Sequence, residues 1–515
     1  MRKTGDSDLQ PSFLINYMTF RNESGRLNLK LANSAANGAF VMLFGQWSKF
    51  TVQIAGTAIL ARILSPGDFG LVAMVTAIIG IAAILSDFGL SLAALRDPDM
   101  SHEDKSNLFW VNLIIGLLAS AIIALTAGPI SDFYGRPELK TIVLALSATF
   151  LLQSAAGQFR AELSRSLRFS RIVAIDVLAQ LGATATAVTL ALTGMGYWAL
   201  VVQQVTIIVL QVMGLATLSG WLPQKPRNLW GTGKHFIFGS KASATQIINY
   251  VSSNADTVAL GAMWGASTTG IYNQAYQFFK VPISQLASPL TNVMIPVLSR
   301  VNDQQMLKYL KHLQSMLIYA IGGVFLILAS VAPPLMLIIL GPGWEGVAPV
   351  LQILAIGGIF QTLGYIYYWF FIVKDLVGRQ LIFGGLARLI MVAMIIAFSP
   401  WGANGVAWAV TAGLAINWTL LTLFVVPRSG LRRRFFLSNS ARPITILLGG
   451  LAGAIAVGHY LPRSLNEFET ISVLLVFWIL YLGTLFIIVR PFRQDIAQIR
   501  IVVNMAKKRP PQKIR

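Results

Sequence analysis

Long apolar segments alternate with short polar stretches along almost the whole chain. Each segment is about 20 residues long, which a helix needs to cross the hydrocarbon core of a membrane. Fourteen can be placed, near residues 39–60, 69–89, 108–128, 141–157, 172–193, 198–219, 236–260, 271–299, 313–332, 348–373, 381–398, 404–426, 443–461 and 470–489. The pattern predicts an all-α polytopic membrane protein with about 14 transmembrane helices.

Composition agrees with that prediction and limits the chemistry. The 515 residues are 55% hydrophobic and 12% charged, which excludes a soluble domain of this size. No residue is cysteine, so disulfides, thiolate catalysis and thiolate metal sites are excluded. The four histidines lack metal-ligand spacing, and we expect surface or packing roles for them. We therefore expect neither a metal site nor a cofactor.

The net charge of +20 has to be tested against membrane topology before nucleic acid is considered. With a cytoplasmic N-terminus, the inside segments hold 32 of the 40 Lys and Arg residues. The outside loops hold four, namely Arg62, Arg136, Lys140 and Arg463. This bias predicts that both termini are cytoplasmic. It also explains the charge without nucleic acid, and the basic tail becomes a topology anchor.

An internal repeat with an offset of 200 residues divides the chain. "LARILSPGDFGL" from Leu60 resembles "LGAMWGASTTGI" from Leu260, and each copy ends the first helix of a block of six. We therefore predict two pseudo-symmetric six-helix lobes and two further C-terminal helices. The boundaries are a cytoplasmic arm at 1–38, an N-lobe at 39–235, a C-lobe at 236–426, a helix pair at 427–489 and a basic cytoplasmic tail at 490–515.

Polar residues form a narrow stripe on the segment 271–299. At about 100° per residue, one face receives Asn273, Gln277, Lys280, Ser284, Ser288 and Thr291. Pro282, Pro289 and Pro296 share the opposite face, and each leaves a carbonyl one turn earlier without its helical N–H. The helix should be bent, with Pro282, just after Lys280, as its hinge.

Two other segments carry similar stripes. Segment 236–260 has Lys241, Thr245, Ser252 and Asp256 on one face, with Asn249 at its edge, and segment 39–60 has Lys49 with Gln46, Gln53, Gly56 and Thr57. Polar stripes in apolar helices mark either a cavity or a helix interface. Lysine favours the cavity, so these three helices are predicted to be its walls.

Four cations remain inside predicted helices: Lys49, Lys241, Lys280 and Arg388. An unpaired cation at the bilayer centre costs about 2.5–3.5 kcal/mol. Lys49 and Lys280 fall near the midplane, whereas Lys241 lies close enough to the cytoplasmic end to reach it. We predict that all four, with Gln53 and Gln277, bind an anionic substrate. The alternative is a structural ion-pair network with Asp87, Asp176 and Asp256.

Two further motifs leave alternatives open. The run "YIYYWFF" from Tyr365 to Phe371 ends a helix on the cytoplasmic side and suits an aromatic belt, or a surface that stacks on sugars. "LGPGWEG" from Leu340 to Gly346 is a Gly/Pro-broken outer loop, suited to an interfacial anchor or part of an outer gate.

Four segments, "LARILSPGDFGLVA", "ADTVALGAMWGASTTGIYNQAYQF", "MIPVLSR" and "LGPGWEGVAPVLQILA", resemble the polysaccharide transporter, or lipid-linked oligosaccharide flippase, family. That family belongs to the multidrug, oligosaccharidyl-lipid and polysaccharide exporter superfamily. The resemblance covers about residues 38–490. It implies a V-shaped cavity, alternating access and a polyprenyl-diphosphate-linked oligosaccharide as substrate.

The same resemblance implies a bacterial inner-membrane protein that serves exopolysaccharide, capsule or O-antigen assembly. Its partners would be membrane lipids, a polysaccharide polymerase and a chain-length regulator, with no nucleic acid and no enzymatic reaction. The alternative is a multidrug antiporter of the same superfamily in which Asp176 or Asp256 carries a proton or sodium ion. It predicts an acidic cavity, against which the midplane lysines argue. A polymerase or ligase that acts on the same lipid would need a large outer loop with catalytic residues, and the predicted outer loops are short. A scaffold role is disfavoured because lysines at the midplane are costly unless they have a function.

Overall fold

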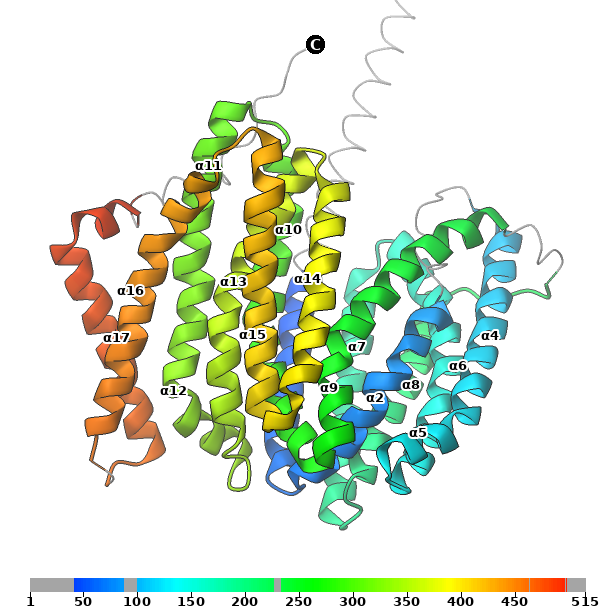
Figure 1. Cartoon of the computed structure of the whole chain (residues 1–515). Coiled ribbons are helices and arrows are strands. Elements are labelled where there is room, and N and C mark those ends of the chain that lie inside the picture. The colour runs from blue at the N-terminus through cyan, green and yellow to red at the C-terminus, as the bar shows by residue number, and fades with distance from the viewer. Residues whose placement is uncertain (1–40, 88–99, 227–232, 463, 496, 498–515) are drawn as a thin grey trace, which may run out of the picture.

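The computed structural model describes residues 41–87, 100–226, 233–462, 464–495 and 497. These residues form long helices joined by short connections, with no strand among them (Figure 1). After a first helix at 41–61, the N-lobe contains α2 (Pro66–Asp87), α4 (His102–Leu125), α5 (Ala127–Tyr134), α6 (Glu138–Arg165), α7 (Phe169–Leu192) and α8 (Trp198–Ser219).

The C-lobe follows in the same manner. It contains α9 (Gly233–Pro282), η2 (Ile283–Ala287), α10 (Ser288–Leu298), α11 (Asp303–Leu317), η3 (Ile318–Gly322), α12 (Gly323–Leu340), α13 (Val347–Val373), α14 (Val377–Phe398), η4 (Ser399–Trp401), α15 (Gly402–Leu420), η5 (Leu421–Val425) and η6 (Val426–Ser429). The last pair of helices is α16 (Arg433–Tyr460) and α17 (Glu467–Ile488).

Every predicted apolar segment corresponds to a helical stretch in this structure. Ten described stretches are long and apolar enough to cross a membrane, and one of them, Val377–Ser429, holds two of the predicted segments. The first helix and the two halves of the α9–α10 stretch account for the other three. The chain is therefore a multi-pass, all-helical membrane protein, and the predicted fold class is confirmed.

The chain reverses direction between the predicted segments 236–260 and 271–299 at a single residue. α9 runs through both, and only Gly265 has a non-helical backbone, with φ 73° and ψ −168°. That left-handed φ favours glycine. Two arms of α9 therefore meet at a single residue, and Figure 1 shows them diverging from the lower end of the molecule, the first arm toward α4.

Beyond Lys280 the second arm is interrupted. α9 ends at Pro282, and the next five residues form the π-helical turn η2 before α10 begins. Proline has no N–H to continue the ladder, and its ring clashes with the carbonyl one turn earlier, so a wider turn at this place relieves both problems. The chain thus departs from α-helical geometry directly after Pro282, where a bend was predicted.

The two copies of the sequence repeat touch each other. A Cβ at Gly70 would clash with the carbonyl oxygen of Ala266, and a Cβ at Gly270 would clash with that of Pro66. Gly270 follows Gly70 by 200 residues, and Ala266 follows Pro66 by 200 residues. Each copy of the repeat therefore places its glycine against the same position of the other copy. The offset seen in the sequence thus corresponds to a pseudo-symmetric crossing of α2 and α9, at which glycine lets the two backbones approach.

Each lobe has a core of its own. The main N-lobe core draws on the first helix, α2 and α4 to α8, and it includes Ala266 of α9. The C-lobe core extends from α9 to α17 and includes Ala61 of the first helix. α17 starts at an Asn466–Glu469 capping box and packs on α12, where the Trp478 indole donates to Ser330 Oγ at 3.0 Å. The final helix pair therefore belongs to the C-lobe side.

Both alternatives for the aromatic run near residue 365, a belt and a sugar-stacking surface, are wrong for four of its rings. Tyr367, Trp369, Phe370 and Phe371 are all at most 1% exposed in the C-lobe core. The Trp369 indole donates to Thr291 Oγ1 at 2.9 Å, and the Tyr367 and Thr422 hydroxyls lie 2.6 Å apart. Because these rings pack against other helices, they serve neither as a belt nor as a sugar-stacking surface.

Candidate functional site

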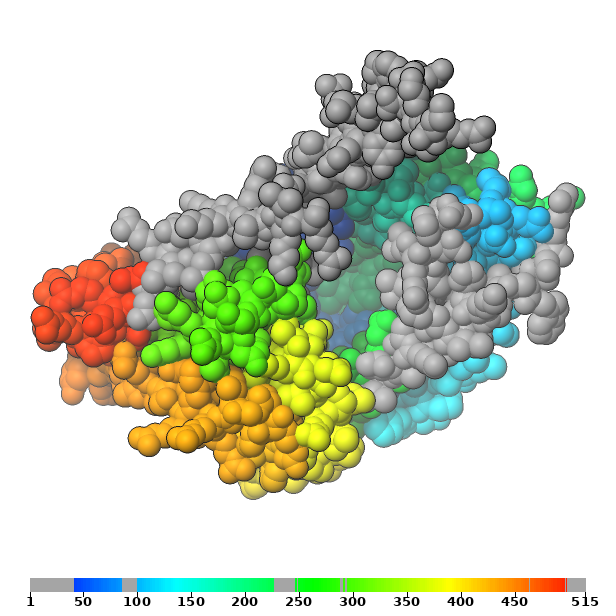
Figure 2. Space-filling view, turned by 90° about the horizontal axis from the view of Figure 1, so that it is seen from above, coloured from blue at the N-terminus to red at the C-terminus, as the bar shows by residue number. Residues whose placement is uncertain are grey.

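A hollow lies between the two lobes. It opens at the end of the molecule where the first helix begins and α10 meets α11, called the open end below. Figure 2 looks into this end and shows the hollow with blue residues from the early part of the chain at its bottom. The opposite, closed end contains Gly265 and the connection between α12 and α13.

The α12–α13 connection closes that end by inserting a tryptophan into the other lobe. Trp344 is 1% exposed. Its indole N–H donates to the carbonyl of Ala61 at 2.9 Å, and its ring meets Phe69 edge to face with centroids 5.2 Å apart. In return, the Arg62 guanidinium donates to the carbonyl of Ile338 at 2.5 Å. Of the two alternatives for this loop, these contacts support the gate.

The same connection is held in shape by its own carboxylate. The backbone N–H of Gly343 donates to Glu345 at 2.9 Å and holds the pKa of that carboxyl below its usual value. Gly341 and Gly343 have φ of 88° and 89°, so two left-handed residues set the turn. The loop thus presents Trp344 to the N-lobe in a defined conformation.

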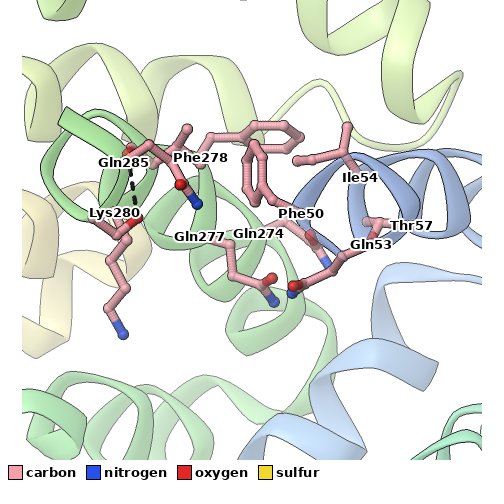
Figure 3. A pocket seen from close by; sticks show the side chains of 11 residues that line it. Phe50, Gln53, Ile54, Thr57, Gln274, Gln277, Phe278, Lys280 and Gln285 are labelled. Atoms are coloured by element: carbon pink, nitrogen blue, oxygen red, sulfur yellow. Dashed lines mark hydrogen bonds between the residues drawn. The ribbon is translucent and has the colours of Figure 1, made fainter. Parts of the chain in front are cut away.

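A pocket of about 220 Å³ lies between the first helix and the second arm of α9. Its lining residues are Phe50, Gln53, Ile54, Thr57, Gln274, Gln277, Phe278, Lys280, Val281, Ser284 and Gln285 (Figure 3). The pocket brings together Gln53, Gln277 and Lys280, which the sequence had assigned to the substrate. It also includes Phe50, Gln274 and Gln285, which lie outside the narrow stripes and were missed.

Lys280 is held against an aromatic ring. Its Nζ lies 4.4 Å from the centroid of Tyr276, one helical turn earlier. Such a contact stabilises an ammonium without neutralising it. Tyr276 in turn stacks on Tyr272, with centroids 5.9 Å apart. Lys280 therefore contributes a positive charge to the pocket that no described carboxylate pairs within ion-pair distance.

Lys49 lies one turn before Gln53 on the first helix, nearer the open end. Its side chain is half-buried and does not line the pocket. The small residues around it pack this helix against α7, because Gly45 and Gly56 lie against Val173 and Thr184. Lys49 therefore lies next to the interface between the first helix and α7, beside the pocket.

The other two predicted cations lie elsewhere. The guanidinium of Arg388 on α14 donates to Asn249 Oδ1 on the first arm of α9, so it ties these helices together near the polar stripe predicted there. The side chains of Lys241 and Asp87 lie outside the described residues. Neither Arg388 nor Asn249 lines the pocket.

Asp256 is a buried carboxylate close to the bend of α9. It is 2% exposed, and it accepts hydrogen bonds from the Tyr272 hydroxyl and the Thr257 backbone N–H, each at 2.7 Å. Asp256, Tyr272, Tyr276 and Lys280 therefore form a continuous polar row from the bend of α9 to the pocket.

Asp176 has a different environment. The Arg160 guanidinium binds both of its carboxylate oxygens, at 2.5 and 3.0 Å, and Gln211 Nε2 donates at 3.0 Å. This charge is compensated within the N-lobe, where α6, α7 and α8 meet. The sequence had grouped the two aspartates, but their partners distinguish them.

A model of the family described as polysaccharide biosynthesis protein matches residues 59–349 of the chain. The lipopolysaccharide biosynthesis protein WzxC of Escherichia coli is 27% identical over 82% of this chain and 88% of its own length. The succinoglycan biosynthesis transport protein ExoT of Rhizobium meliloti is 26% identical over 60% and 63%. The teichuronic acid biosynthesis protein TuaB of Bacillus subtilis is 25% identical over 55% and 59%.

Solved structures share the fold. The lipid II flippase MurJ, in an inward closed conformation, superposes with a TM-score of 0.65 at 13% identity, over 90% of this chain and 99% of MurJ. An inward-facing multidrug transporter of the MATE family gives 0.57 at 14% identity, over 76% and 98%. At these identities the likeness concerns the fold.

Proposed function

The chain belongs to the polysaccharide biosynthesis protein family, and from that premise we propose that it is a flippase for polyprenyl-diphosphate-linked oligosaccharides. It moves repeat units across the bacterial inner membrane for exopolysaccharide, capsule or O-antigen assembly. The observation that carries the proposal is the Lys280-bearing pocket in the hollow between the lobes. The names of the relatives support it, because WzxC, TuaB and ExoT are named for polysaccharide biosynthesis or transport.

The chemistry of the pocket suits a diphosphate better than a cationic drug. Among its described lining residues Lys280 is the charged one, and the rest are amide, hydroxyl and apolar side chains. An ammonium attracts a diphosphate and repels a cation. Lys49, one turn before Gln53 on the first helix, Arg388 on α14 and Lys241 complete the proposed anion-binding set with Gln53 and Gln277.

The described state fits one half of an alternating-access cycle. With both termini cytoplasmic, as the charge bias predicts, the open end faces the cytoplasm and Trp344 closes the outer end. Export then requires the lobes to separate at Trp344 and approach at the open end. Pro282 is the proposed hinge, since η2 separates Lys280 from α10.

In this proposal, Asp256 is the first candidate for the residue that carries the coupling ion. It lies at one end of the row of side chains that leads through Tyr272 and Tyr276 to Lys280 in the pocket. Asp176 is the second candidate, although Arg160 already compensates it. The flippase carries out no enzymatic reaction, and its proposed partners are membrane lipids, a polysaccharide polymerase and a chain-length regulator.

Transport in vesicles tests the proposal directly. Purified protein in proteoliposomes should translocate a fluorescent polyprenyl-diphosphate disaccharide. Lys280→Ala and Lys49→Ala should abolish this transport, whereas the Lys→Arg variants should retain part of it because charge is preserved. Lys311→Ala removes a cation from the exposed surface of α11 and serves as the matched control. Full transport by both cavity variants would refute the diphosphate site.

A further inference from the structure

Lys49 is a membrane-embedded cation that has no ion-pair partner in the described part of the chain. It is the only charged residue of the first helix at 41–61, and its side chain is half-buried. None of the ion pairs found among the described residues includes it. An unpaired cation near the bilayer centre costs about 2.5–3.5 kcal/mol. A carboxylate within reach of Lys49 would recover part of that free energy.

The packing of the first helix on α7 shows where such a carboxylate can lie. A Cβ at Gly45 would clash with Val173, and a Cβ at Gly56 would clash with Thr184. The two contacts are 11 residues apart on each helix, so the helices run parallel and in register. Lys49 follows Gly45 by one turn and therefore shares the face of the first helix that meets α7.

Asp176 lies at nearly the same height on α7. Lys49 is four residues beyond Gly45, and Asp176 is three residues beyond Val173, so their heights along the two helices differ by about 1.5 Å. Asp176 is also the only acidic residue of α7. The four-carbon stem of a lysine is long and flexible, and the glycines bring the two helices close together. Asp176 is thus the carboxylate that matches Lys49 in register.

Another cation holds Asp176 in the described state. Arg160 on α6 binds both of its carboxylate oxygens, and Gln211 donates to one of them at 3.0 Å. The side chains of Arg160 and Asp176 are still 37% and 20% exposed, so the ion pair is not sealed off from a second cation. Arg160 and Lys49 can therefore compete for one carboxylate, and whichever binds it leaves the other cation free.

The first helix connects this competition to the closed end of the molecule. The Trp344 indole anchors the end of that helix through its hydrogen bond to the carbonyl of Ala61 at 2.9 Å. This bond is lost when the lobes separate there, and the first helix is then free to shift against α7. Lys49 and Asp176 already lie at nearly the same height, so a small shift is enough to bring them together.

We propose that Asp176 passes from Arg160 to Lys49 during the transport cycle and thereby sets the affinity for the diphosphate. The inference rests on the proposed flippase function. While the open end faces the cytoplasm, Arg160 holds Asp176, and Lys49 is free to bind the diphosphate. Once the closed end opens, Lys49 pairs with Asp176 and the substrate is released. Asp176 is a positioning residue in this scheme, because it acts through Lys49.

Thermal unfolding without any ligand tests the exchange in the full-length protein in detergent. The four proteins are the wild type, Lys49→Gln, Arg160→Gln and the double variant. Lys49→Gln by itself removes an unpaired cation and should leave the melting temperature unchanged or raise it. In Arg160→Gln, Lys49 takes over Asp176, so the addition of Lys49→Gln should lower the melting temperature. Equal shifts in the two backgrounds would overturn the inference.

Binding of farnesyl diphosphate, measured by calorimetry, tests the consequence for the substrate. Arg160→Gln should weaken binding about tenfold, because Asp176 then occupies Lys49. In a Lys49→Gln background the same change should have no further effect, whereas a general loss of positive charge would act in both backgrounds. Lys105→Gln is the matched control: it breaks the Lys105–Glu162 ion pair of the same lobe and should leave the affinity unchanged.

Asp176→Asn separates the exchange from a structural role. Lys49 then stays free in every state, so this variant should bind farnesyl diphosphate at least as tightly as the wild type and yet export slowly, while Asp176→Glu should restore export. Normal export by Asp176→Asn, or a joint loss of binding and export, would overturn the inference. A wild type that does not bind farnesyl diphosphate would instead refute the diphosphate site of the proposed function. The melting temperatures would still decide whether Lys49 takes over Asp176.

Discussion

Removal of the Trp344 side chain should open the closed end of the molecule. The indole belongs to the C-lobe but makes two contacts with the N-lobe: a hydrogen bond to Ala61 and an edge-to-face contact with Phe69. Both are lost when the lobes separate there. Their sum is therefore what the tryptophan contributes to closure, apart from its packing inside the C-lobe.

The size of that contribution follows from the two contacts. The hydrogen bond is worth about 1 kcal/mol, and the aromatic pair about 0.5–1.5 kcal/mol. Together they favour closure by about 1.5–2.5 kcal/mol, which is about 10- to 70-fold in the equilibrium between closed and open outer ends. Trp344→Ala should shift the equilibrium by that factor. Trp344→Phe keeps a ring but loses the N–H, so it should shift it about fivefold.

Spin-label distances measure the shift. The chain has no cysteine, so labels placed at Lys140 in the N-lobe and Asn404 in the C-lobe, both exposed near the closed end, report on it alone. Trp344→Ala should populate a longer distance than the wild type does, and Trp344→Phe should lie between them. Identical distance distributions for all three proteins would show that Trp344 packs its own lobe and does not hold the gate.

Three further predictions concern motion and topology. Pro282→Ala restores a helical N–H and should straighten the second arm, leaving membrane insertion and lipid binding intact while export slows; normal export would reduce Pro282 to packing. Gly270→Ala places a methyl group against the Pro66 carbonyl and should lengthen the distance between the same spin labels, so an unchanged distance would contradict the close crossing. Reporter fusions after Arg433 and after Arg463 should report opposite compartments, and one shared compartment would contradict fourteen helices.

Local pattern alone determined the helices of this protein. A helix that crosses a membrane satisfies its own backbone hydrogen bonds, so its existence depends on the length and polarity of one segment. This is why all fourteen segments could be placed, and why the repeat at Leu60 and Leu260 could be seen as two equivalent halves. The same independence made Gln53, Gln277 and Lys280 predictable, since a polar stripe is a property of a single helix.

Contacts between helices cannot be predicted from the pattern of a single segment. Only the tertiary structure decided them. The aromatic run near residue 365 has the composition of a membrane interface, but the neighbouring helices bury four of its rings. Asp176 and Asp256 look alike in sequence; one is bound by Arg160 and the other by Tyr272. Gln274 lies off the predicted stripe and faces the pocket because the first helix and α9 meet beside it. Which residue lies opposite another depends on how helices pack, and no single segment encodes that.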